Sequence, residues 1–182
     1  MASIITATNS SGLTQSADNS GVLQLASGTG NLVTVPSVTG TAMVSGNMPA
    51  FSAYTSAGTS LSNATFTKIN YATENFDTNN NFASSRFTPT VAGYYQITAI
   101  TRLGSITASI VAFKLYKNGV DNTAGCSCGV VAGYVYPSVS TLIYANGSTD
   151  YFEVYCYQNS GGSTTTDSGT DYTFTGVLVR TA

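Results

Sequence analysis

The segment 87–98, FTPTVAGYYQIT, constrains the fold more than any other part of the chain, because it joins a tight turn to a strand. Pro89 fixes its own φ angle and, together with Gly93, prevents a helix from forming here. From Gly93 onward apolar residues recur with a period of two, which places Tyr95 and Ile97 on the same face of an extended strand. The segment therefore predicts a β-strand whose inward face carries these two side chains.

The low content of charged residues points to the same fold class. Charged residues make up 8% of the chain, against roughly 25% in an average soluble domain. Solubility must therefore come from Ser, Thr, Asn, Gly and Tyr, and the Thr and Tyr among them favour pleated, half-buried strands. We expect an all-β protein. With only six Lys plus Arg and a net charge of −2, the chain lacks the basic surface that nucleic-acid binding requires.

Further strand candidates follow one another at short intervals with turn residues between them, a pattern typical of a sandwich or barrel. The Asn118-Gly119 pair predicts a two-residue type I′ hairpin, and Asn146-Gly147 predicts a second hairpin of this kind between the neighbouring strands. The predicted strands are Ala50–Tyr54, Thr65–Tyr71, Tyr94–Leu103, Ile110–Tyr116, Gly129–Tyr136, Val139–Tyr144, Tyr151–Tyr157 and Tyr172–Arg180.

The chain divides near residue 47 into an N-terminal arm, residues 1–46, and a larger domain, residues 47–182. The arm holds two short alternating pieces, Val22–Leu25 and Leu32–Val35, separated by turn-forming residues. A two-stranded unit is marginally stable alone in water, so we expect the arm to attach to another protein or to the larger domain. The alternative is a poorly ordered terminus. The expected attachment residues are Ile4, Ile5, Val22, Leu23, Leu25, Leu32, Val33 and Val35.

Several ordered motifs in residues 48–182 together resemble a C1q-like domain. They are Pro49–Tyr54, Phe66–Asp77 and Phe87–Tyr95 in the first half, and Lys114–Gly119, a strand pair within Leu142–Val154 and Phe174–Leu178 in the second half. The resemblance implies a ten-stranded jelly-roll sandwich of the tumour-necrosis-factor type, with both termini at one end, that assembles as a compact homotrimer. The scaffold core is then expected to contain Phe51, Phe66, Phe87, Tyr95, Ile97, Val154, Phe174 and Leu178.

The aromatic content agrees with subunit packing. Twelve Tyr and eight Phe in a chain without Trp are more aromatic surface than one small core needs, and aromatic residues are enriched where subunits meet. The alternative is a monomer whose tyrosines occupy cross-strand pairs on its sheets.

We expect no catalytic activity and no cofactor. Because the chain contains no His, nucleophile systems that use Ser-His or Cys-His pairs are excluded. The eight carboxylates are scattered through the sequence, whereas a glycosidase needs two of them facing each other across a cleft. A Ser-Lys pair using Lys68, Lys114 or Lys117 is the catalytic arrangement that the composition leaves open.

One segment has a partial likeness to a calcium site. Asp77, Asn79 and Asn81 place oxygen ligands at alternate positions, as the start of an EF-hand calcium loop does, and some C1q-like relatives bind calcium through apical loops. Phe82 stands where that loop needs Gly, and Thr88 stands where it needs Glu, so we interpret the segment as a solvated loop.

The cysteines have a separate interpretation. Cys126 and Cys128 cannot complete a four-ligand zinc site in a chain without His. Cys156 alternates with apolar residues and is expected to be a small buried hydrophobe.

The N-terminal sequence indicates where the protein is made and used. The N-terminus lacks the basic and apolar regions of a signal peptide, and no apolar run approaches the roughly 20 residues of a membrane span, so we expect no membrane partner. A collagen-like Gly-X-Y stalk is also missing. The Ser/Thr/Asn-rich arm instead resembles the N-terminal parts of structural proteins of tailed bacteriophages. We therefore expect a virion protein that is assembled in the host cytoplasm.

Two functions fit a virion protein of this kind. In the first, it is a trimeric capsid decoration or cement protein whose arm grips the major capsid protein while the jelly roll faces outward. In the alternative, it is the tip of a receptor-binding tail fibre or spike, attached to other tail proteins, whose apical loops bind a host surface glycan or protein. An arm of 46 residues is short for a fibre shaft, which favours the capsid.

Overall fold

The computed structural model describes residues 23–26, 32–35, 46 and 48–182. Contacts divide the chain into two units, residues 1–41 and 42–182. In the first unit, β1 (Leu23–Ala26) pairs antiparallel with β2 (Leu32–Val35). Five expected attachment residues lie on these strands, namely Leu23, Leu25, Leu32, Val33 and Val35. Ile4, Ile5 and Val22 lie outside the described residues.

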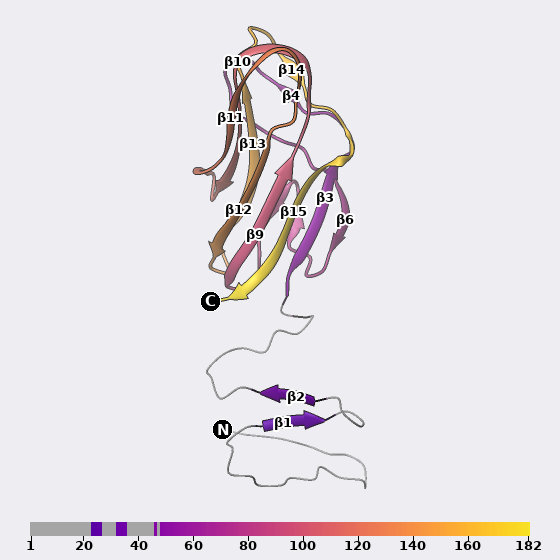
Figure 1. Ribbon diagram of the computed structural model, residues 1–182, viewed down its shortest axis with the longest axis vertical. Helices are drawn as coiled ribbons and strands as arrows, with labels where there is room; N and C mark the ends of the chain where they lie inside the picture. Colours follow the sequence, from indigo (N-terminus) through magenta and orange to yellow (C-terminus); the bar gives the residue numbers. More distant parts are fainter. Residues whose placement is uncertain (1–22, 27–31, 36–45, 47) are drawn as a thin grey trace. The chain divides into compact units, whose positions relative to one another are not determined.

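The second unit is a sandwich of two antiparallel sheets, as the all-β expectation requires (Figure 1). One sheet has the order β12 (Ser138–Ala145), β9 (Gly93–Ile100), β15 (Gly169–Thr181), β3 (Ala50–Thr55) and β6 (Thr73–Asp77). The other has the order β11 (Val120–Val135), β10 (Leu103–Lys117), β13 (Phe152–Gln158), β8 (Arg86–Phe87) and β7 (Phe82–Ala83), and β5 (Thr67–Lys68) also pairs with β13. A separate short pair joins β14 (Thr164–Thr165) to β4 (Ser60–Leu61).

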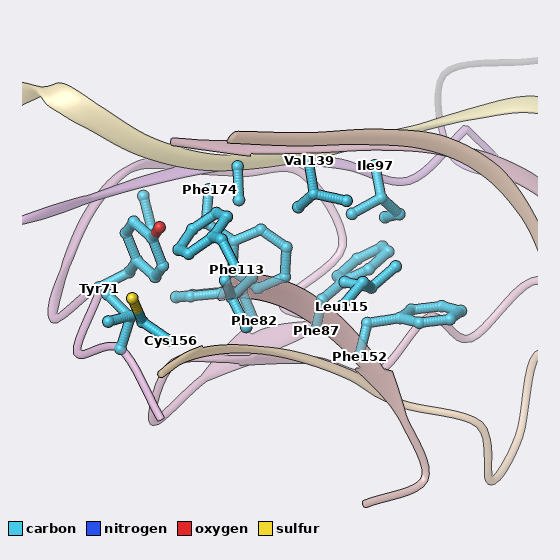
Figure 2. Close-up of a cluster of buried hydrophobic side chains, with 14 of the residues drawn as sticks. Tyr71, Phe82, Phe87, Ile97, Phe113, Leu115, Val139, Phe152, Cys156 and Phe174 are labelled. Atoms are coloured by element: carbon cyan, nitrogen blue, oxygen red, sulfur yellow. The ribbon is translucent and has the colours of Figure 1, made fainter. Parts of the chain in front are cut away.

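The core lies between the two sheets and is rich in aromatic rings (Figure 2). The Phe51 ring stacks on Phe82 and Phe87 with centroid separations of 4.7 and 4.4 Å, and it meets the edge of Phe174 at 4.9 Å. Alternation along β9 buries every second residue. Seven of the eight expected core residues are buried, namely Phe51, Phe87, Tyr95, Ile97, Val154, Phe174 and Leu178.

The expectation that Phe66 belongs to the core is wrong. Its side chain is 37% exposed, and its ring lies beside Tyr116 and Tyr157 at centroid distances of 6.0 and 5.2 Å. The cause is the strand period, because Ile69 and Tyr71 take the inward positions of this segment and are fully buried. Phe66 therefore lies on the outer face of its sheet.

The two Asn-Gly pairs have different roles. Asn118 and Gly119 have φ angles of 55° and 78° and connect Lys117 to its partner Val120, so the predicted two-residue hairpin between β10 and β11 is confirmed. The hairpin predicted at Asn146-Gly147 is wrong, because β12 and β13 belong to different sheets. There the Asn146 Oδ1 atom accepts hydrogen bonds from the backbone N–H groups of residues 148, 149 and 150, which turns the chain from one sheet to the other.

The strand boundaries also differ from the expected ones. β10 begins at Leu103 and β11 at Val120, well before the expected Ile110 and Gly129. Register shifts interrupt the β10–β11 pairing at several points, so the apolar residues there do not keep the period of two on which the expectation depended.

Chain entry and exit lie at the same end of the sandwich, as expected (Figure 1). The backbone N–H of Leu178 donates to the carbonyl of Pro49 at 2.9 Å, and Thr181 pairs with Gly93. The opposite end, where Ile100 pairs with Ser138, is here called the distal end. Within the described residues, no helix has the length and apolar character needed to cross a membrane.

Candidate interaction surfaces

The outer face of the five-stranded sheet carries an unusual number of exposed apolar side chains. The period of two on β9, β12 and β15 buries one set of residues and turns the other outward. Leu142 and Val179 are each 56% exposed. The register brings Leu142 and Val177 to either side of Gln96, and Tyr144 opposite Tyr94. The exposed members, here called the apolar face, are Phe76, Tyr94, Leu142, Tyr144, Val177 and Val179.

Two shallow clefts cross the apolar face. One, of about 560 Å³, is lined by Tyr94, Leu142 and Val179 together with the last residues of the chain. The other, of about 360 Å³, lies between Phe76 and Val177. Contiguous exposed apolar surface with hollows of this kind is typical of surfaces that other proteins cover.

The polar groups within the apolar face are mostly neutral. Gln96 Nε2 donates to the Ser140 hydroxyl at 2.9 Å, and the hydroxyls of Thr98 and Ser140 lie 3.2 Å apart. These groups satisfy one another along the strands, and the one charged side chain among the described residues that line either cleft is Arg180, near the C-terminal end of β15. A neutral centre is the property that distinguishes the core of a protein interface from ordinary surface.

A second candidate surface lies at the distal end, where the Arg102 guanidinium is surrounded by tyrosines. Its central carbon is 4.9, 5.9 and 5.7 Å from the ring centroids of Tyr134, Tyr136 and Tyr172. Arg102 donates to the Tyr136 hydroxyl at 3.4 Å and forms an ion pair with Asp167. Tyr134 and Tyr136 are 62% and 55% exposed. Hydrogen bonds to Tyr136 and then Asp167 raise the pKa of Arg102 further above its usual range, so this cation is permanent.

This arrangement, here called the distal cluster, escaped the sequence reasoning. Arg102 lies between β9 and β10, Tyr134 and Tyr136 lie at and just after the end of β11, and Tyr172 lies near the start of β15, so the topology alone brings them together. Within the sequence, the surplus of Tyr was the only signal of it.

The segment with an EF-hand likeness forms a self-contained turn. The two carboxylate oxygens of Asp77 accept from the backbone N–H groups of Asn79, at 3.3 Å, and of Phe82, at 2.7 Å. The Asn81 side chain is buried and bonds to Thr90. Asp77, Asn79 and Asn81 lie close together, but the side-chain oxygens of Asp77 and Asn81 already accept hydrogen bonds from backbone N–H groups that stabilise the turn. In the part of the chain that the structure describes, no three His, Cys, Asp or Glu residues gather as a metal site would need.

The cysteines are all free. Cys156 is fully buried in the core, as expected, and burial raises the pKa of its thiol to about 12. Cys126 is half-buried and Cys128 is exposed. Burial raises the pKa of Cys128, and the neighbouring Cys126 raises it further. A thiol with a raised pKa is a poor nucleophile at neutral pH.

The three lysines considered for a Ser-Lys pair each form an ion pair. Lys68 lies 3.0 Å from Glu153, Lys114 lies 3.6 Å from Asp121, and Lys117 lies 2.8 Å from Asp150.

Comparison with solved structures identifies the fold. The globular domain of zebrafish complement 1qA protein matches with a TM-score of 0.53 and 14% identity, over 74% of this chain and 99% of that one. Murine APRIL matches with a TM-score of 0.53 and 11% identity, over 72% and 99%. PRD1 vertex protein P5 matches with a TM-score of 0.49 and 15% identity, over 74% of this chain and 98% of that one. This TM-score is too low to support an argument. No family model matches the chain, and no curated protein does.

The second unit is therefore a jelly roll of the C1q and tumour-necrosis-factor type, as the sequence motifs implied.

Proposed function

We propose that this protein is a non-enzymatic, homotrimeric structural protein of a tailed-phage virion, and that it decorates the capsid with its jelly roll outward. The apolar face of the five-stranded sheet carries the proposal. Leu142, Val177 and Val179 are each more than 40% exposed there in the single chain, and their burial by a second copy would be favourable by about 25 cal/mol per Å².

A closed ring of copies would cover the apolar face. Large, apolar and charge-poor surfaces are typical of permanent oligomers rather than of transient contacts. The C1q-like resemblance implies three copies around one axis, and closed symmetry leaves no apolar face uncovered.

The arm supplies the proposed attachment to the capsid. A two-stranded unit such as β1 and β2 is marginal alone and gains stability when it adds to another protein. Binding that exists only in the assembled particle stabilises that state by mass action, which is the physical role of a cement protein.

Light scattering tests the trimer. The full chain should have three times the monomer mass of 18.8 kDa at micromolar concentration. Leu142→Asp should give a monomer, because it buries three unpaired carboxylates in the interface. Val120→Asp is the matched control, since Val120 is 68% exposed on the other sheet, and it should remain a trimer. A monomeric wild-type chain contradicts the proposal.

The distal cluster favours one second candidate, a receptor-binding tip. Exposed Tyr and Arg are the residues most often found at binding hot spots, and here they stand at the end opposite to chain entry. In this case purified protein should block adsorption of the phage to its host, and Tyr134→Ser should relieve the block. No competition at saturating protein would exclude this candidate.

A further inference from the structure

A third surface, separate from the apolar face and the distal cluster, contains a polar hollow. It is a cleft of about 570 Å³ beside β5, β7 and β8, and its lining includes Lys68, Asn80, Ser84, Arg86 and Thr88. Small-molecule sites typically measure about 300 to 1,000 Å³. Because Phe87 and Ile69 point into the core, Arg86 and Lys68 lie on the outer face of the six-stranded sheet.

A buried carboxylate fixes the two cations of the cleft. Glu153 is 3% exposed, and its Oε1 atom accepts from Lys68 Nζ at 3.0 Å and from Arg86 Nε at 2.9 Å. Its Oε2 atom accepts from the Tyr155 hydroxyl at 3.2 Å. Burial raises the pKa of Glu153, but the hydrogen bonds from Lys68 and Arg86 outweigh burial and hold the pKa below its usual range. Lys68, Arg86 and Glu153 together carry one net positive charge, because two cations share one carboxylate.

Arg86 is held so that part of its guanidinium remains free. The central carbon lies 3.9 Å from the centroid of the Tyr151 ring, and Nε is used by Glu153. The side chain is still 44% exposed and lines the cleft. A guanidinium fixed in one plane presents its terminal N–H groups in the geometry that binds a carboxylate with two parallel hydrogen bonds.

The backbone of the cleft is strained. Ser84 and Ser85 have φ angles of 52° and 57°, and Asn80 has a φ of 54°. The two serines form the turn between β7 and β8, where Ala83 pairs with Arg86. Such turns prefer Asn-Gly, so a Ser-Ser turn is unfavourable locally. Strained residues of this kind cluster at functional sites, and this turn also directs the Ser84 carbonyl to Lys68 Nζ at 3.0 Å.

We propose that the cleft binds one carboxylated saccharide unit. The carboxylate pairs with Arg86 and Lys68, and the neutral side chains of Asn80, Ser84 and Thr88, which line the cleft beside them, hydrogen-bond to the ring hydroxyls. A single net positive charge matches a monoanion, whereas a polyphosphate would need more cations. The site takes no part in the proposed trimer, so its failure and the failure of the trimer are distinguishable.

Titration calorimetry on the full chain tests the site with D-glucuronate and N-acetylneuraminate as probes. At least one of the two should bind, and D-glucose should bind at least roughly tenfold more weakly, because it leaves the cations without a partner. Arg86→Gln should weaken binding by roughly tenfold or more through loss of the charged pair. Lys114→Gln, on the same sheet but outside the cleft lining, is the matched control and should bind like wild type.

A second variant keeps the test valid if Arg86→Gln disturbs folding. Thr88 lines the cleft and makes no bond to Glu153, so Thr88→Val should fold normally and still weaken binding a few-fold through loss of one hydrogen bond. Absence of binding by both acids at millimolar concentration overturns the proposal. So does equal binding of D-glucose, or equal binding of inorganic phosphate, which would make the cleft a simple anion site.

Discussion

Ile97 has no exposed surface and lies at the centre of the sandwich, where Figure 2 places it beside Val139. Ile97→Ala should lower the free energy of unfolding by roughly 2–5 kcal/mol, because the deleted methyl groups leave a cavity that rigid neighbours cannot fill. Urea denaturation measures the change. Val120→Ala, at a 68% exposed position, is the control and should change stability by less than about 0.5 kcal/mol. An equally small change for Ile97→Ala would contradict the assignment of Ile97 to the core.

Asp150 and Glu153 make the free energy of unfolding depend on pH. Burial raises the pKa of both, but hydrogen bonds, first from Asn118 for Asp150 and from Lys68 for Glu153, hold both pKa values below their usual range. A carboxyl whose folded pKa is depressed stabilises the fold above its unfolded pKa, about 4. That contribution is lost as pH falls through the folded pKa.

The urea midpoint should therefore fall as pH decreases below about 4. Asp150→Asn and Glu153→Gln should each flatten this dependence, since each removes one of the titrating groups. Glu153→Gln should also lower stability at neutral pH, because Lys68 and Arg86 lose their shared partner. The same acid dependence in both variants would show that other carboxyls control it.

The β10–β11 hairpin depends on two residues with positive φ. Gly119 has a φ of 78°, and an added Cβ would lie 3.3 Å from the Tyr151 hydroxyl. Gly119→Ala should reduce stability by about 1–2 kcal/mol, because an L side chain is unfavourable in this region. Gly104→Ala is the matched control, since no atom lies within 4 Å of an added Cβ there. Equal thermal unfolding midpoints for the two variants would contradict the hairpin assignment.

Sequence reasoning succeeded for elements whose signals are local. The alternation in β9 and the Asn118-Gly119 turn depend on neighbouring residues, and both were predicted correctly. Asn146-Gly147 has the same dipeptide, yet it joins two sheets, because the partner of a strand is decided by tertiary packing. Bulges hid the starts of β10 and β11 for a similar reason, since they break the period of two.

The candidate sites were beyond sequence reasoning because they are assembled across elements. Arg102 meets Tyr134 and Tyr172 only when the ends of β9 and β11 and the start of β15 come together. The carboxylate between Lys68 and Arg86 comes from β13, far along the chain from both. Composition predicted that aromatic residues would lie on the surface, and the topology determined their positions there.

The candidate interaction surfaces lie on different sides of the jelly roll. Chain entry and exit lie at one end, the distal cluster lies at the other, and the apolar face and the cleft beside β5, β7 and β8 lie on the outer faces of different sheets. A copy held by its arm and covered along its apolar face would therefore keep both polar surfaces open. This arrangement lets attachment, assembly and ligand binding be tested independently.

Removal of residues 1–41 tests attachment without disturbing the trimer. The remaining unit, residues 42–182, is compact by its own contacts, and it retains the Gly46 carbonyl that accepts from Asn79 Nδ2 at 3.1 Å. The shortened protein should have three times its monomer mass in light scattering, because the apolar face is intact. It should no longer co-sediment with capsids that lack the protein, since β1 and β2 are gone.

Full-length Leu142→Asp provides the reciprocal control, because it keeps the arm but loses the trimer and should bind capsids more weakly than wild type through loss of multivalency. Undiminished capsid binding by residues 42–182 would reject the arm as the anchor and move the attachment site to the jelly roll.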